Sequence, residues 1–150
     1  MSPAEVVELD RDHIDDAWPV MSQLRTHLSP SQFHEVAAEM MDSGYRLFAV
    51  RADAAIVAVA GVSIGLNLYY GRYMWVYDLV TVEGSRSRGH GRMLLAALER
   101  VARTEGCEMI ALSSALHRTD AHRFYEGPGG FERVSYTFRK RLGPRVIGSP

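Results

Sequence analysis

Residues 73–82 (YMWVYDLVTV) form a run in which Asp78 is the only charged side chain. The run is rich in β-branched and aromatic residues, which favour strands, and it is much shorter than the roughly 20 apolar residues that cross a bilayer. A strand that is apolar at almost every position is normally covered on both faces, because neither row of its side chains is left in water. The chain is therefore expected to build a sheet with helices packed on both faces.

Length and charge narrow the class of protein further. The 150 residues are 47% hydrophobic and 23% charged, which is typical of one globular domain. We expect that domain to span residues 1–150, with a flexible tail at about 143–150. The formal net charge of −1 argues against nucleic acid as a partner. The first residues lack a leader pattern and no apolar run is long enough for a membrane span, so we expect a cytoplasmic protein with no membrane partner.

Alternating and continuous apolar runs predict strands, and capping residues mark the helices. The order is β-α-α-β-β-β-α-β-α-β, which predicts an α/β (α+β) fold with a mixed, mostly antiparallel central sheet. The expected strands are 5–9, 46–51, 55–64, 73–82, 108–114 and 131–142, and the expected helices are 12–25, 29–43, 89–104 and 119–126.

The corner between the apolar strand and the helix at 89–104 reads RSRGHGR, residues 86–92. A helix N-terminus offers unpaired N–H groups and positive potential, and Gly89 and Gly91 let an anion approach them. Phosphate binding is one interpretation, and a plain surface turn with solvated arginines is the other. The corner is neither a P-loop, because the lysine is missing, nor a dinucleotide fingerprint, because the third glycine is missing.

Together with AHRFYEGPGGF at residues 121–131, the corner resembles two signatures of the GNAT-type N-acetyltransferases. Arg86-x-x-Gly89-x-Gly91 is similar to the signature that binds the coenzyme A pyrophosphate. The resemblance covers about residues 5–142, and it implies the GNAT (acyl-CoA N-acyltransferase) fold, with acetyl-CoA as co-substrate and no metal.

The resemblance also implies roles for individual residues. The strand segment that splays from its neighbour is implied to hold the pantetheine arm, the corner to hold the pyrophosphate, and Tyr125 to lie near the coenzyme sulfur. The implied coenzyme-binding residues are Leu79, Val80, Thr81, Arg86, Ser87, Arg88, Gly89, His90, Gly91 and Arg92.

This chain departs from the family pattern at three positions. Arg118 replaces an asparagine that contacts pantetheine, and Met93 stands where a third small residue is common. The loop after Tyr125 is one residue longer than usual, which predicts a reshaped turn.

Acetyl transfer to an amine needs a proton acceptor, an oxyanion donor and a proton for the leaving thiolate. Asp78 is the candidate base, because a carboxylate among apolar neighbours is expected to have a raised pKa; a buried ion pair is the equal alternative. The backbone near Val80 is the candidate donor and Tyr125 the candidate acid. Weaker candidate bases are Glu83, His27 and His122, and a water chain would need none of them.

The acceptor is expected to be the primary amine of a small molecule or peptide, held by about residues 12–42. An aromatic cluster that includes Tyr73, Trp75 and Tyr77 either lines the acceptor pocket or fills the core. Cys107 is an acyl carrier in one interpretation and a small core residue in the other. The leading hypothesis is direct attack in a ternary complex. A coenzyme-binding module without turnover is the alternative, and a homodimer is left open.

Overall fold

A computed structural model of the chain describes residues 3–82, 89–145 and 147. Within these residues, five strands form one open sheet in the order β1-β2-β3-β4-β5. Neighbours from β1 to β4 are antiparallel, and β5 runs parallel to β4. The strands are β1 (Glu5–Leu9), β2 (Arg46–Ala52), β3 (Ala55–Asn67), β4 (Gly71–Thr81) and β5 (Met109–Leu112).

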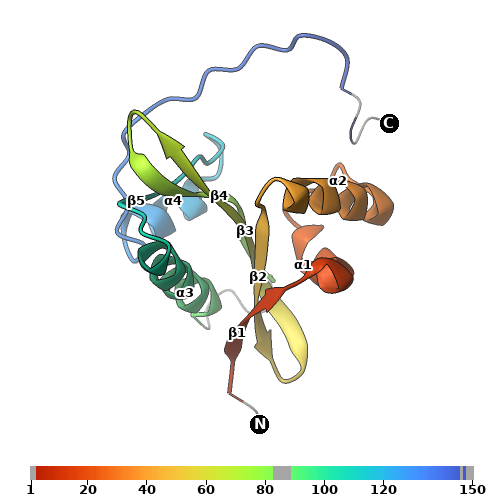
Figure 1. Cartoon of the computed structure of the whole chain (residues 1–150). Coiled ribbons are helices and arrows are strands. Elements are labelled where there is room, and N and C mark those ends of the chain that lie inside the picture. The colour runs from red at the N-terminus through yellow and green to blue at the C-terminus, as the bar shows by residue number, and fades with distance from the viewer. Residues whose placement is uncertain (1–2, 83–88, 146, 148–150) are drawn as a thin grey trace.

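Helices cover both faces of the sheet, as the apolar strand predicted. In Figure 1, α1 and α2 lie on one side of the sheet, and α3 and α4 on the other. The helical elements are the 3-10 helix η1 (Arg11–Ala17), α1 (Trp18–Met21), α2 (Pro30–Asp42), α3 (His90–Thr104) and α4 (Thr119–Glu126).

The two faces of the sheet bury separate core clusters. Along β2, Leu47 and Ala49 belong to the cluster under η1, α1 and α2. Phe48 and Val50 belong to the cluster under α3. This alternation follows from the two-residue period of a strand, and it fixes the register of the sheet because a one-residue slip would exchange the two sets.

A β-bulge at Tyr77 interrupts that alternation in β4. Gly61 pairs with Asp78 and Val62 pairs with Val76, so Tyr77 is the additional residue. A bulge turns two successive side chains to the same face. Tyr77 and Asp78 both contact residues on the α1/α2 side, whereas strict alternation from Val76 would have turned Asp78 toward α3.

Most of the predicted elements are confirmed, and α2 shows why. Ser29 accepts a hydrogen bond from the Gln32 N–H, the Gln32 side chain accepts one from the Ser29 N–H, and Pro30 occupies the first turn. This reciprocal capping box satisfies two N–H groups that would otherwise lack partners.

Two predicted elements need correction. The helix expected at 12–25 is a 3-10 helix followed by the short α1, because Pro19 has no N–H for a continuous helix and sits in the first turn of α1. The segment expected as a strand at 131–142 has no strand assignment, although its alternating sequence is that of a strand.

Candidate active site

The N-terminus of α3 keeps the features expected of an anion-binding corner. Gly89 precedes the helix with a φ of +78°, a conformation that glycine adopts without strain. A Cβ on Gly91 would lie 3.1 Å from Thr81 Oγ1, so the glycine allows α3 to approach β4 closely. His90 is buried, and its Nδ1 has no hydrogen-bond partner among the described residues. Arg92 is exposed.

The remaining residues predicted at this corner, Arg86, Ser87 and Arg88, lie outside the described residues, as does the weaker base candidate Glu83. The features that fit a pyrophosphate are therefore the glycine conformation, the close packing at Gly91 and the first N–H groups of α3.

β4 and β5 pair over only four residues, which leaves the end of β4 without β5 beside it. The described ladder runs from Tyr73 with Met109 to Val76 with Leu112, whereas β4 continues to Thr81. This is the separation of strands that the resemblance implied.

The backbone groups of β4 alternate in direction beyond that ladder. The Val82 N–H donates to the Val57 carbonyl at 2.8 Å. Ladder bonds to one neighbour recur at every second residue of a strand, so Val80 shares this direction toward β3. The backbone groups of Leu79 and Thr81 consequently point to the side on which β5 has ended.

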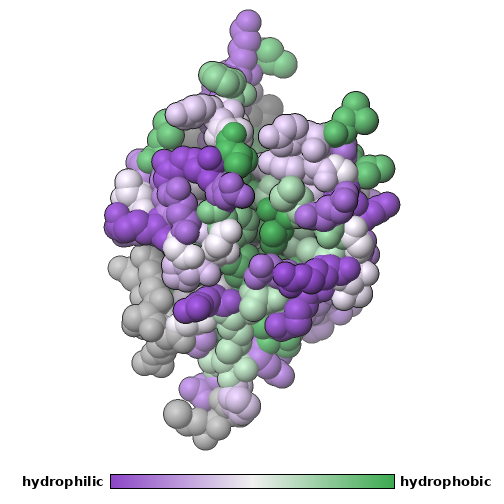
Figure 2. Space-filling view, turned by 90° about the vertical axis from the view of Figure 1, so that its left-hand side faces the viewer, coloured by the Kyte–Doolittle hydropathy of each residue, from purple (hydrophilic) through white to green (hydrophobic). Residues whose placement is uncertain are grey.

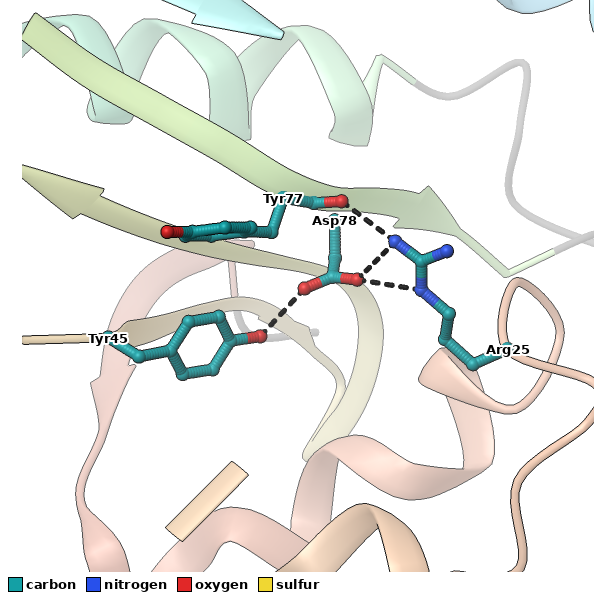
Figure 3. A network of polar contacts seen from close by, with 4 residues as sticks. All are labelled: Arg25, Tyr45, Tyr77 and Asp78. Carbon is teal, nitrogen blue, oxygen red and sulfur yellow. Dashed lines mark hydrogen bonds and ion pairs between the residues drawn. The ribbon is translucent and has the colours of Figure 1, made fainter. Parts of the chain in front are cut away.

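Asp78 lies at the centre of a buried polar network (Figure 3). Its Oδ1 accepts hydrogen bonds from Arg25 Nε at 2.9 Å and pairs with Arg25 Nη2 at 2.7 Å. Its Oδ2 accepts the Tyr45 hydroxyl at 2.8 Å. Arg25 Nη2 also donates to the Tyr77 carbonyl at 2.8 Å. Asp78 is 8% exposed and the Arg25 side chain 38%, so the network opens to solvent on the arginine side.

Gly61 makes room for this network. A Cβ on Gly61 would lie 1.8 Å from the Tyr45 hydroxyl oxygen, a separation that no side chain tolerates. Gly61 is the residue paired with Asp78 across the sheet. The missing side chain therefore lets Tyr45 cross β3 and reach the carboxylate.

The environment holds the Tyr45 hydroxyl in its neutral form. Burial, together with the negative charge of Asp78, raises the pKa of Tyr45 well above 10.0. The neutral hydroxyl donates its proton toward Asp78, which satisfies a carboxylate oxygen that would otherwise be costly to bury. The ion pair that the sequence left open for Asp78 is thus present, and its role as a base stays a prediction.

Tyr125 lies on α4 in the core cluster that also contains Leu79. The rings of Phe124 and Phe131 pack edge-on against it, with centroids 5.7 and 5.8 Å away. Burial raises the pKa of Tyr125 above 10.0, and the nearby Arg118 guanidinium opposes this rise. The residue that departs from the family's asparagine therefore acts on the candidate acid.

The other candidate residues have different surroundings. His122, a weaker candidate base, makes a hydrogen bond from its Nε2 to the Ala115 carbonyl at 2.9 Å. Burial and two neighbouring arginines lower the pKa of His27. Burial raises the pKa of the Cys107 thiol, which makes it a poorer nucleophile.

Among the described residues, no group of three or more His, Cys, Asp and Glu side chains is arranged to hold a metal ion. No described helix is long and apolar enough to cross a membrane.

A pocket of about 360 Å³ opens on the α2 side of the sheet, beside the buried network. The Ser63 hydroxyl donates to the Tyr77 hydroxyl at 3.1 Å on its wall, and Tyr77 is 42% exposed. Tyr77 is thus part of an open surface as well as a packing partner of Tyr45. The lining residues are Glu39, Met40, Ser43, Tyr45, Ser63 and Tyr77.

Sequence reasoning missed Arg25, Tyr45 and Gly61 as parts of the site. Arg25 and Tyr45 are separated from Asp78 by 53 and 33 residues, so no local motif links them. Gly61 stood inside an apolar strand, where a glycine is a signal for a bulge or a close backbone approach.

Comparison with known proteins identifies the class to which this fold and site belong. The family model of the acetyltransferase (GNAT) family matches residues 11–131. The chain therefore belongs to this family of acyltransferases, which uses acetyl-CoA.

Individual relatives agree with this assignment. YhdJ of Bacillus subtilis (strain 168), an uncharacterized N-acetyltransferase, is 40% identical over 126 residues, which cover 83% of this chain and 89% of that protein. The aminoalkylphosphonate N-acetyltransferase of Salmonella typhimurium is 25% identical over 95% of this chain and 94% of its own.

Solved structures show the same fold at lower identity. The aminoglycoside N-acetyltransferase AAC(6')-Iy in complex with CoA superimposes with a TM-score of 0.82 at 17% identity, covering 95% of this chain and 97% of that one. An acetyltransferase of Trypanosoma brucei gives a TM-score of 0.74 at 19% identity, covering 93% and 100%.

Proposed function

We propose that this chain transfers the acetyl group of acetyl-CoA to the primary amine of a small molecule or peptide, by direct attack of the amine in a ternary complex. The observation that carries the proposal is the unpaired end of β4. There, Asp78 faces the α1/α2 side, and Leu79 belongs to the same core cluster as Tyr125 on the α3 side. The backbone groups of Leu79 and Thr81 point to the side on which β5 has ended.

The α3 corner holds the coenzyme in this proposal. The first N–H groups of α3, with the arginines of residues 86–92, bind the pyrophosphate. The bound coenzyme supplies an activated acetyl thioester. The Leu79 N–H, which points to the open side of β4, is the donor for the oxyanion, replacing the backbone near Val80 that the sequence suggested. One such donor is typically worth about 3–4 kcal/mol.

Asp78 takes the proton of the attacking amine. Alkyl amines have a pKa near about 10.4 and are mostly charged at neutral pH, so a proton acceptor beside the attack site is required. A carboxylate has about four lone-pair positions, two on each oxygen; on Oδ2 the Tyr45 hydroxyl uses one of them, while Arg25 binds Oδ1. The remaining position on Oδ2 is the one that receives the amine proton.

Tyr125 gives a proton to the departing thiolate. Its raised pKa keeps the hydroxyl protonated through neutral pH, as an acid requires. The thiol has a pKa near about 8.5 and leaves tolerably well without help, so this contribution is smaller than that of Asp78.

The pocket beside Tyr45 holds the acceptor in this proposal. Glu39 attracts an ammonium group, and the Ser63 and Tyr77 hydroxyls offer hydrogen bonds. Since one relative is named for aminoalkylphosphonates, these compounds belong in any acceptor panel, beside aminoglycosides, polyamines, amino sugars and peptides with a free amine.

The test combines turnover and binding. Release of free thiol from acetyl-CoA with each member of the panel is expected to exceed the rate without acceptor for at least one amine. Coenzyme binding with no turnover across the panel would instead support the alternative, a binding module.

A matched pair of variants tests the corner. Gly89→Asp and Gly89→Asn impose nearly the same backbone cost, since both residues tolerate a positive φ and a side chain there meets no atom within 4 Å. Only Asp adds a charge that repels the pyrophosphate, so its Kd for acetyl-CoA is expected to rise at least about 10-fold above that of Asn. Equal affinities in a calorimetric titration would place the pyrophosphate elsewhere.

A further inference from the structure

Arg25 holds Asp78 with two of its three guanidinium nitrogens and leaves the third one over. Nε and Nη2 contact Asp78 Oδ1, and Nη2 also donates to the Tyr77 carbonyl. A guanidinium carries five N–H donors, two of them on Nη1. Nη1 has no hydrogen-bond partner among the described residues, and no dashed line reaches it in Figure 3. Because the Arg25 side chain is 38% exposed, a ligand can reach the guanidinium from solvent.

The turn that carries Arg25 is held in place from both sides. The Arg25 N–H donates to the Met21 carbonyl at 2.9 Å, and the Leu28 N–H donates to the Arg25 carbonyl at 3.2 Å. Leu24 and Leu28 pack against the core cluster under α1 and α2. The guanidinium is therefore positioned before a ligand arrives, which lowers the entropic cost of binding to it.

This turn belongs to the acceptor side of the molecule. Arg25 follows α1, and α1 and α2 cover one side of the sheet, whereas α3, which begins at the coenzyme corner, covers the other (Figure 1). Figure 2 views the α3 side, where apolar residues are exposed along the middle between hydrophilic patches. Tyr45 and Tyr77 line the α2 pocket and also contact the network of Asp78 and Arg25. Arg25 thus lies beside the pocket and not with the arginines of residues 86–92.

The charges at Asp78 favour an acceptor that brings a negative group of its own. Asp78 is 8% exposed and already pairs with Arg25. A simple alkylammonium at Oδ2 would be a second cation on one carboxylate, and the excess positive charge would lie in a poorly solvated site. Once Asp78 had taken the amine proton, the guanidinium would lose its counter-ion. A negative group bound to Nη1 keeps the site neutral before and after this proton transfer.

The neighbouring His27 reports the same positive surroundings. Partial burial lowers its pKa, and the charges of Arg145 and Arg25 lower it further. His27 is exposed and lies two residues beyond Arg25, and a neutral imidazole keeps one N–H that can donate to an anion. Two guanidinium groups near one neutral histidine attract an anion rather than a second cation.

We propose that the acceptor is a zwitterion, whose amine binds at Asp78 Oδ2 and whose carboxylate, or another oxyanion a few bonds from the nitrogen, binds Arg25 Nη1. This inference rests on the proposed role of Asp78 as the proton acceptor. Arg25 then determines specificity, because Nε and Nη2 position Asp78 while Nη1 selects the acceptor. The rest of the acceptor occupies the pocket beside Tyr45 and Tyr77.

Matched pairs of acceptors test the inference in the wild type. Each pair is an amino acid and its amide, such as β-alanine and β-alaninamide, which differ in one negative charge. In thiol-release assays, kcat/KM is expected to be at least about 10-fold higher for the acid, the effect of one charge-assisted hydrogen bond. The amide has the less basic amine, so basicity alone predicts the opposite order. Analogues with a sulfonate or a phosphonate in place of the carboxylate identify the oxyanion that fits best.

Two failures of this experiment have different meanings. If amines are acetylated but no acid exceeds its amide, the zwitterion proposal is overturned and the proposed acetyl transfer stands. If no amine in the panel releases thiol, the proposed function itself is contradicted.

Arg25→Lys separates selection of the acceptor from support of Asp78. Lysine keeps the positive charge but lacks the planar fork that binds two oxyanions at once. The acid-to-amide ratio of kcat/KM is therefore expected to fall at least about fivefold, whatever the change in kcat. Arg11→Lys, at an exposed arginine that pairs with Asp42, is the matched control and keeps the ratio.

A binding measurement gives the same ratio without turnover. The Kd values of N-acetyl-β-alanine and of its amide are titrated by calorimetry with coenzyme A present, on variants that circular dichroism shows to be folded. The wild type is expected to bind the acid at least about 10-fold more tightly than the amide, and Arg25→Lys is expected to lose most of this difference. An unchanged ratio in Arg25→Lys overturns the proposal.

Discussion

The two faces of β4 are both buried, but they carry different chemistry. Toward α3, Met74, Val76 and Leu79 pack with Leu94 and Leu98 in a cluster of aliphatic and aromatic side chains. Toward α1 and α2, the same strand buries the charge of Asp78, held by an arginine and a tyrosine. A buried ion pair is often no more stabilising than apolar residues of the same size. We infer that the first face supplies stability and that the second is shaped for chemistry.

The bulge at Tyr77 determines the face of β4 to which Asp78 turns. With strict alternation, Asp78 would point into the mostly apolar cluster under α3, away from Arg25 and Tyr45. The bulge and Gly61 bring the carboxylate to the side that also carries the α2 pocket. A local break in the ladder therefore decides which face of the sheet carries the buried carboxylate.

The largest expected effect comes from removing the charge of Asp78 on the α1/α2 face of β4. Asp78→Asn keeps an acceptor for the Tyr45 hydroxyl but can no longer take a proton, so kcat is expected to fall about 10²–10⁴-fold. The free energy of unfolding is expected to fall by only about 1–3 kcal/mol, because Arg25 retains access to water. Steady-state thiol release and urea denaturation measure the two effects.

The control for this change is Asp53→Asn in the exposed turn between β2 and β3. Its φ of +51° suits asparagine, so neither kcat nor stability is expected to change. If Asp78→Asn retains the wild-type kcat, the ion pair of Asp78 is structural. The two faces of β4 then do not differ in a catalytic role.

The next effect tests the apolar face. Leu98 is fully buried under the sheet, and Leu98→Ala is expected to cost about 2–5 kcal/mol of unfolding free energy, for lost contacts and the cavity left behind. The kcat of the folded fraction is expected to stay within about twofold, since the aliphatic side chain of Leu98 takes no part in the proposed proton transfers. Arg100→Ala, on the exposed side of α3, is the control and should cost less than about 0.5 kcal/mol. If Leu98→Ala lowers kcat but leaves stability at the wild-type level, the inference that the α3 face supplies stability rather than chemistry is wrong.

The sequence predicts the apolar face much better than the chemical one. Continuous and alternating apolar runs are local, so they predicted the strands of the sheet and the helix that begins beside Gly89. The bulge at Tyr77 depends on how β4 pairs with β3, which no short run records. The Arg25 and Tyr45 contacts depend on tertiary packing for the same reason. The strand predicted at 131–142 has the alternating pattern of a strand, but a strand also needs a neighbour to pair with, and none of the described strands pairs with this segment.

A smaller effect is expected where the α3 face meets the site. Tyr125→Phe removes the hydroxyl that we propose as the proton donor, and it is expected to lower kcat about 10–100-fold, equivalent to about 1.4–2.7 kcal/mol, with little change in the KM for acetyl-CoA. Because the pKa of Tyr125 is raised, its ionisation should cause no loss of rate below pH 10. Tyr69→Phe, on an exposed ring, is the control. An unchanged kcat across pH would show that the thiolate leaves without this proton.

The smallest expected effect is a pH dependence of the unfolding free energy, which comes from Tyr45 on the α1/α2 face. The pKa of Tyr45 is raised well above 10.0 by burial and by Asp78, whereas in the unfolded chain a tyrosine ionises near about pH 10. The stability from this group is therefore fully present below pH 10 and is lost as the pH rises further, at up to about 1.4 kcal/mol per pH unit. Tyr45→Phe is expected to cost about 1 kcal/mol at neutral pH and to remove this slope, whereas Tyr69→Phe leaves it in place. Unfolding free energies between about pH 9 and 11 measure the difference between the two slopes. If the wild type and Tyr45→Phe have identical slopes, the Tyr45 hydroxyl ionises in the native state as it does in the unfolded chain. The buried network then does not hold this hydroxyl neutral.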